Sequence, residues 1–184
     1  MKFFNTIVTV ELSKEIIDKA KKFSEAVTIT VNYSDSNQIL KTKIKDDNFI
    51  SKLGEEAAKK VFGTYTVVTG PDYQIYDAKQ KSWDDDLYVD AVGLAIKTMR
   101  RTVARRYGLS WTFQAGNLRR DKILGKPDAW VCFVEYDDEN KGSLCNVYPP
   151  YQIKELIFKD PILLKLKGHK LVVYKSDLPL QVLG

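Results

Sequence analysis

The stretch of residues 129–136 is nearly all apolar, and it constrains the fold more than any other part of the sequence. A strand that is hydrophobic at successive positions is covered on both faces, so it belongs at the centre of a sheet. The run is far shorter than the roughly 18 apolar residues that span a bilayer. The stretch therefore predicts the central strand of a globular domain and gives no sign of a membrane span.

Hydrophobic periodicity predicts the elements around this strand. Helices are expected over 13–23, 47–62 (stopped by Gly63), 150–158 and, in a shorter form, 160–168. Strands are expected over 64–68, 73–76, 109–114 and 169–174, with a hairpin of 86–89 and 93–97 that turns near Asp90. Residues 27–31 and 101–105 each fit either a strand or a helix. This order predicts a single α/β or α+β domain over 1–184, built on a central mixed β-sheet flanked by helices.

The two cysteines and the single histidine argue against a disulfide or a zinc site. Cys132 and Cys145 lack CxxC spacing, so buried, reduced thiols are expected. His169 alone cannot supply a zinc cluster. Residues 1–12 lack a basic start followed by an apolar block, so no signal peptide is expected. The sequence therefore predicts an intracellular, cytoplasmic protein.

Charge is distributed unevenly along the chain, although the net charge of +5 is mild. Residues 97–126 hold nine Lys or Arg against Asp121 alone, which gives +8, and they include all six arginines. Residues 72–90 hold six Asp against two Lys, which gives −4. Carboxylates can hold a divalent cation, and guanidinium groups can hold a phosphodiester backbone. The pattern favours a metal-dependent phosphodiesterase over a solvated surface of uneven charge.

Three residues combine these charges at one predicted site. Glu55 lies on a predicted helix, Asp86 opens the first strand of the hairpin, and Lys97 ends the second. A hairpin would set Asp86 and Lys97 close together. Carboxylates there could bind Mg²⁺, and the lysine could stabilise developing charge or orient the attacking water. Exposed helix charges are the alternative for Glu55, and an edge or paired position is the alternative for Lys97.

Four short motifs in this order resemble the PD-(D/E)XK, or restriction-endonuclease-like, nucleases, and within them a group of small phage-type proteins. The matching pieces are Gly54-Glu55-Glu56-Ala57, Asp86-Leu87, Ile96-Lys97-Thr98 and Trp111-Thr112-Phe113-Gln114. The resemblance spans residues 54–114, within a core motif region of 48–136. It implies a restriction-endonuclease-like fold and a Mg²⁺- or Mn²⁺-dependent endonuclease that hydrolyses DNA phosphodiester bonds, in a host cell if the protein is phage-encoded.

The resemblance also implies roles for individual residues. Glu55, Asp86, Lys97 and Gln114 would be catalytic, with Asp86 and Glu55 as metal ligands. A structural hydrogen bond is the alternative for Gln114. The family has an acid two residues before the lysine, where this chain has Ala95, and Glu55 is the first candidate to replace it. Without such a replacement, the chain would be a catalytically inactive nucleic-acid-binding protein on the same fold.

The arginines would contact DNA, and the implied contacts are Arg100, Arg101, Arg105, Arg106, Arg119 and Arg120. The competing interpretation pairs these arginines with the acids of residues 72–90. A chain this small would cut both strands only as a homodimer or by two successive nicks. A phage-type protein that binds another protein is a third possibility.

A second match to the family pattern is a decoy. Pro71-Asp72 and Lys79 lie too close in sequence for a hairpin, and Pro-Asp after Gly70 indicates a turn. The three tryptophans are expected in the core rather than as platforms for bases, and they are Trp83, Trp111 and Trp130.

Overall fold

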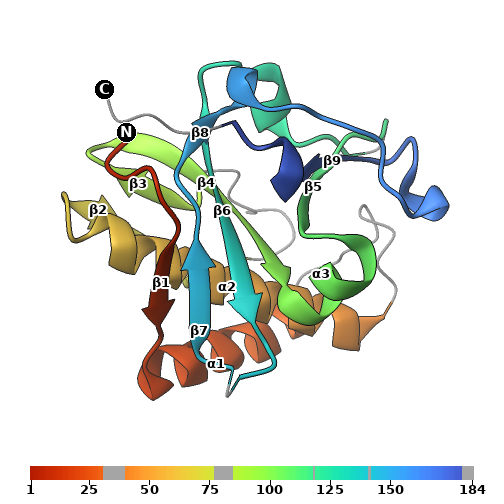
Figure 1. Cartoon of the computed structure of the whole chain (residues 1–184). Coiled ribbons are helices and arrows are strands. Elements are labelled where there is room, and N and C mark those ends of the chain that lie inside the picture. Colours follow the sequence, from red (N-terminus) through yellow and green to blue (C-terminus); the bar gives the residue numbers. More distant parts are fainter. Residues whose placement is uncertain (31–39, 77–84, 118, 141, 180–184) are drawn as a thin grey trace.

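The computed structural model describes residues 1–30, 40–76, 85–117, 119–140 and 142–179. The strands are β1 (Val8–Glu11), β2 (Val68–Thr69), β3 (Leu87–Val89), β4 (Val92–Arg100), β5 (Ser110–Gln114), β6 (Trp130–Asp137), β7 (Leu144–Val147), β8 (Tyr151–Gln152) and β9 (Lys170–Tyr174). The α-helices are α1 (Lys14–Thr30), α2 (Lys41–Phe62) and α3 (Arg101–Tyr107). Together they form a mixed α/β arrangement around a curled sheet (Figure 1).

The main sheet has the strand order β1-β7-β6-β4-β3-β2, and β8 also pairs with β6. β4 and β6 run parallel, while the other pairs in this sheet are antiparallel. β5 and β9 form a separate antiparallel pair. The prediction of a central apolar strand is confirmed, because β6 lies between β4 on one side and β7 and β8 on the other.

The predicted hairpin is also confirmed. β3 pairs with β4 so that Leu87 faces Leu94 and Val89 faces Val92. Asp90 and Ala91 make the turn with positive φ values of 49° and 63°. Two consecutive residues with positive φ twist a short turn in the sense that β-hairpins need. The turn fixes the register, and the register sets where Asp86 meets β4.

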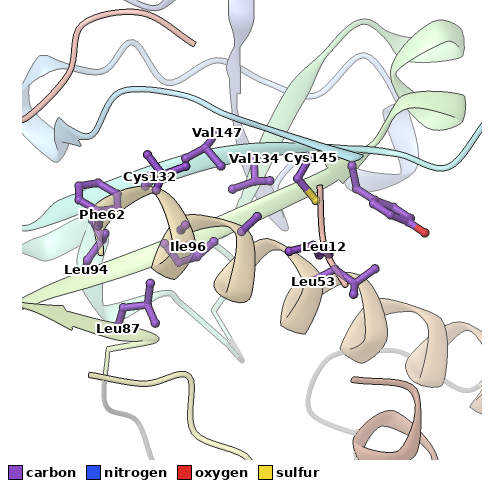
Figure 2. Packing of buried hydrophobic residues seen from close by; sticks show 14 of the residues in the cluster. Leu12, Leu53, Phe62, Leu87, Leu94, Ile96, Cys132, Val134, Cys145 and Val147 are labelled. Atoms are coloured by element: carbon purple, nitrogen blue, oxygen red, sulfur yellow. The ribbon is translucent and has the colours of Figure 1, made fainter. Parts of the chain in front are cut away.

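Helix α2 packs on one face of the sheet, with α1 against it (Figure 1). Leu53 and Phe62 of α2 meet side chains of β3, β4, β6 and β7 in the buried cluster that Figure 2 shows. Cys132 and Cys145 belong to this cluster, and both thiols are free and buried, as expected. Burial of so many aliphatic side chains, each contributing about 1.5–3 kcal/mol, is what holds α2 on the sheet.

A second cluster covers the opposite face of β4 and β6. Trp111 and Phe113 of β5 pack there with Phe133 of β6, and the Trp111 and Phe133 rings stack with centroids 4.5 Å apart. Trp111 is buried and Trp130 packs against the first cluster, which confirms a core position for both. Trp83 lies outside the described residues.

Several predicted elements differ from the structure. Residues 27–30 continue α1 rather than forming a strand, and α2 begins at Lys41, before the predicted start. The predicted strand over 64–68 is reduced to β2, and the one over 73–76 is wrong. Residues 101–105 form a helix, α3. β5 and β9 match their predicted strands closely.

The predicted helix over 150–158 is wrong. Tyr151 pairs with Val131 in β8, and a capping box between Gln152 and Glu155 then closes a single 3₁₀ turn, Ile153–Glu155. Pro150 was expected to start this helix, but the apolar residues after it pack into the second cluster from a strand and a tight turn. The next predicted helix is likewise only a 3₁₀ turn, Leu164–Leu166, which precedes Gly168 with a φ of 78°. Among the described residues, no helix is long and apolar enough to cross a membrane.

Candidate active site

The candidate site lies at the start of β3, where β4 extends beyond its pairing with β3. β3 covers only Val92–Leu94 of β4, so the edge of β4 beyond Leu94 has no strand partner on that side among the described residues. Asp86 directly precedes β3, and its carboxylate accepts a 2.6 Å hydrogen bond from the backbone N–H of Ile96. The carboxylate therefore takes the place of the missing strand partner, and this bond fixes its position against β4.

Glu55 reaches the same place from α2. Gly54 allows the helix to approach β4 closely, because a Cβ at this position would overlap the side chain of Thr98. Glu55 is only 2% exposed, so the alternative of an exposed helix charge is wrong. Its carboxylate accepts hydrogen bonds from Ser51 Oγ (3.0 Å) and Lys52 Nζ (2.5 Å) in the preceding helical turn.

The two carboxylates influence each other's protonation. Burial and then the charge of Asp86 raise the pKa of Glu55 to about 8, against the opposing effects of Lys52 and Ser51. Burial also raises the pKa of Asp86, while the N–H of Ile96 and the charge of Lys97 oppose the change. Desolvation and like charge both disfavour two ionised carboxylates at one place. The pair therefore retains a proton near neutral pH unless a further cation approaches.

The side chain of Lys97 lies on one face of the sheet, and those of Leu94 and Ile96 lie on the other. Its ammonium lies 2.7 Å from a carboxylate oxygen of Asp121 and 4.9 Å from the centre of the Phe113 ring. Its charge also lowers the pKa of Asp86, so the lysine acts on both aspartates. The charge of Lys97 thus reaches Asp86, but the ion pair of Lys97 is with Asp121, so the paired position that was the alternative for this lysine is present.

Gln114 joins the site through its backbone. Its N–H lies 3.2 Å from the Asp121 carboxylate oxygen that Lys97 also contacts, and its carbonyl accepts a 2.9 Å bond from the Asp121 N–H. Gln114 itself is half-buried. In the sequence, Asp121 is the one acid of a basic stretch, and no local pattern indicates that it pairs with Lys97.

Lys52 is a second lysine that sequence analysis missed. Besides its contact with Glu55, its ammonium lies 5.0 Å from the ring centre of Phe23 and 5.5 Å from that of Tyr73. The hydroxyl of Tyr73 donates a 3.0 Å hydrogen bond to Glu56. The three-residue helical spacing of Lys52 and Glu55 could have indicated the pair, but the aromatic contacts depend on tertiary structure.

Arg100, Arg101 and Arg105 pair with acids of the described residues. Arg101 binds Glu135 at 3.0 Å and also contacts Asp137. Arg100 lies near Asp46 and Asp138, and Arg105 lies 2.7 Å from Glu139. None of these acids belongs to residues 72–90, the segment that the competing interpretation named. Arg106 and Arg120 are exposed, and Arg119 is half-buried and has contacts of its own.

The remaining predicted carboxylates lie elsewhere or outside the described residues. Asp72 accepts bonds from Gln74 N–H (2.8 Å) and Tyr76 Oη (2.6 Å), which is the turn that its sequence indicated. Lys79 and Asp84 lie outside the described residues. Ala95, which stands where the family has an acid, packs against the second cluster. This position therefore supplies no carboxylate to the site.

A divalent cation is compatible with this donor set. In the described part of the chain, no group of three or more His, Cys, Asp or Glu side chains could hold a metal ion. Mg²⁺ is commonly held by one or two carboxylates, with water and phosphate oxygens completing the octahedron. Glu55 and Asp86 supply that number, and a bound cation would favour the ionised form of both carboxylates, whose pKa values are raised.

Comparisons of the chain with protein-family models, with curated proteins and with solved structures find no match.

Proposed function

We propose that this protein is a metal-dependent endonuclease of the PD-(D/E)XK kind that hydrolyses DNA phosphodiester bonds. One observation carries the proposal: Asp86, held by the N–H of Ile96 at the uncovered edge of β4, is close enough to both buried Glu55 and Lys97 to interact electrostatically with each of them. Helix carboxylates and strand lysines are expected to point to solvent. Their convergence at a partly buried position requires a reason, and perturbed carboxylates beside a lysine are typical of catalytic sites.

The arrangement of the elements supports a restriction-endonuclease-like fold. The antiparallel pair β3–β4 continues into the parallel pair β4–β6, and α2 covers one face of both. Asp86 lies at the start of β3, beside the edge of β4 that β3 leaves uncovered, and Glu55 on α2 and Lys97 on β4 interact with it there. Along the chain, a helix carboxylate comes first, then an acid at the start of a strand, then a lysine on the next strand. The sequence motifs of the family have the same order.

The residues divide the chemical work between them. A bound Mg²⁺ or Mn²⁺ would supply Lewis acidity and lower the pKa of the attacking water. Glu55 and Asp86 would hold that ion, with Asp86 oriented by the N–H of Ile96. Lys97, which Asp121 holds in place, would stabilise the negative charge that develops on the phosphate. The same ammonium could orient the attacking water.

A nicking assay tests the proposal. Supercoiled plasmid is incubated with the protein and Mg²⁺ or Mn²⁺, with EDTA as the blank and Lys97→Met as the variant. Cleavage is expected only with the metal, and it should be lost in Lys97→Met. An exposed lysine replaced in the same way, Lys165→Met, is the matched control and should cleave like the wild type. Absence of cleavage by wild-type protein on plasmid, single-stranded and branched DNA would contradict the proposal.

Ala95 supports a second candidate, a catalytically inactive nucleic-acid-binding protein. Its methyl group packs against the second cluster, so this position supplies no acid beside Lys97, and in the described residues no group of three or more His, Cys, Asp or Glu side chains could hold a metal ion. Salt-sensitive DNA binding without cleavage in any divalent metal would select this function.

A further inference from the structure

Lys170 is a half-buried lysine without a counterion beside the candidate site. It is the first residue of β9 and lies directly opposite Gln114 of β5. Within the part of the chain that the structure describes, its ammonium makes no hydrogen bond and no ion pair. Burying a charge without a partner is unfavourable, so its position requires an explanation.

The neighbouring charges do not neutralise it. Two carboxylates, Asp47 and Asp121, act on Lys170, but each already has a lysine of its own. Lys43 lies 3.4 Å from Asp47, and Lys97 lies 2.7 Å from Asp121. Among the described residues, three lysines therefore share two carboxylates, which leaves one positive charge unmatched.

The protonation of Lys170 reflects the same imbalance. Burial and then the charge of Lys43 lower its pKa, and Lys97 adds to this effect, while Asp47 and Asp121 oppose it. An anion placed among the three lysines would reverse these effects. It would restore the ordinary pKa of Lys170 and remove the cost of its burial.

The anion that suits this place is a phosphate. Lysine binds phosphate oxygens as a point charge and does not require the planar geometry of arginine. Lys97 belongs both to this group and to the candidate active site, so the two places adjoin. Arg120 is exposed and pairs with Ala115, the residue that follows Gln114, and it extends positive charge away from Lys170 along the surface.

We propose that Lys170, together with Lys43 and Lys97, forms a subsite for a nucleic-acid backbone phosphate next to the phosphodiester that is cleaved. Cleavage of the adjoining phosphodiester rests on the proposed function, whereas the subsite itself requires only that DNA binds. Contact with the phosphate releases a condensed counterion, so each such contact adds to the salt dependence of binding.

The first test measures duplex DNA binding in EDTA at several salt concentrations. Lys170→Met should lower the slope of log Kd against log salt by about 0.9, the value for one lost phosphate contact. Lys170→Arg, which keeps the charge, should retain most of the slope. Lys165→Met removes an exposed lysine of the same segment and should leave the slope near that of the wild type. Equal slopes for Lys170→Met and Lys165→Met would overturn the proposal.

The second test uses the wild-type fold, so it does not depend on how well Lys170→Met folds. Lysines are ¹³C-dimethylated and titrated by NMR, and Lys170→Arg identifies the Lys170 resonance. The pKa of Lys170 should lie below those of the exposed lysines and rise when a short duplex is added, with inorganic phosphate producing a smaller rise. No change on adding duplex would overturn the subsite. If the wild type cleaves nothing but Lys170 still responds, the subsite stands and the proposed hydrolysis fails.

Discussion

The buried carboxylate of Glu55, on α2, lies near enough to Asp86, at the start of β3, for the charge of Asp86 to raise the pKa of Glu55. This relationship connects a helix to the edge of the sheet at a place where a purely structural core would hold apolar side chains. Burial is the largest cause of the shift, so the pair is costly to ionise in the absence of a metal ion. The consequences can be measured without any assay of cleavage.

The stability of the protein should fall as the pH rises toward 8. The folded-state pKa of Glu55, about 8, lies above its ordinary value of 4.5. Between these values the folded state binds more protons than the unfolded state, so this contribution is complete below 4.5 and is lost as the pH rises through the folded pKa. Thermal unfolding in EDTA should show Tm decreasing over this window. Glu55→Gln should flatten the decrease, and the exposed control Glu11→Gln should not; equal pH profiles for wild type and Glu55→Gln would contradict the account.

Divalent metal ions should stabilise the protein, and more so at higher pH. A cation that binds both carboxylates competes with their proton, so its apparent affinity rises as Glu55 ionises. At a metal concentration 100 times Kd, the free energy of unfolding should increase by about 2.7 kcal/mol. Differential scanning fluorimetry with Mg²⁺ or Mn²⁺ measures the effect. Asp86→Asn should remove it; a variant as responsive as the wild type would place the metal elsewhere.

Gly54→Ala should destabilise the fold. The added Cβ would overlap the Thr98 side chain, so α2 or β4 would have to move, and such overpacking costs about 1–3 kcal/mol. Urea unfolding gives the difference in free energy. Gly54→Ala combined with Thr98→Ala should recover part of the loss, because the overlapping hydroxyl is removed. A fully additive double variant would show that the two residues do not constrain the helix.

Arg101 and Arg106 should differ in what their removal changes. Arg101 contacts the buried acid Asp137, so Arg101→Ala should reduce the free energy of unfolding by up to about 3 kcal/mol. Arg106 is exposed, so Arg106→Ala should leave stability unchanged and lower the salt slope of DNA binding by about 0.9. Chemical denaturation and binding titrations on both variants separate the roles. The reverse assignment would show that α3 holds DNA through Arg101.

The sequence predicted the hairpin and the central strand because their signals are local. Asp90-Ala91 between alternating hydrophobic residues determines the turn, and the apolar run of β6 determines burial on both faces. The prediction of a helix over 150–158 was wrong because tertiary packing determines the backbone of Tyr151 and Ile153. They pack into the second cluster from a strand and a 3₁₀ turn, which tertiary contacts select over helix propensity.

The candidate site was predictable where order along the chain determines proximity. Asp86 and Lys97 flank one hairpin, and the resemblance added Glu55. Asp121 and Lys170 come near the site from elements distant in sequence, and no spacing rule indicates this. Lys52 lies three residues before Glu55, so helical spacing could indicate that pair, but its aromatic contacts depend on tertiary structure. The pairing of Arg101 with Glu135 likewise depends on α3 lying beside β6.

The most direct test of the central claim compares two aspartates in one cleavage experiment. Asp86→Asn removes the carboxylate at the edge of β4, and Asp72→Asn removes an exposed carboxylate in a turn that also matches the family pattern. Single-turnover cleavage with saturating, pre-bound DNA and Mg²⁺ isolates the chemical step from binding. The account predicts that Asp86→Asn abolishes cleavage while DNA affinity is retained, and that Asp72→Asn cleaves at the wild-type rate. Cleavage that survives Asp86→Asn but is lost in Asp72→Asn would contradict it.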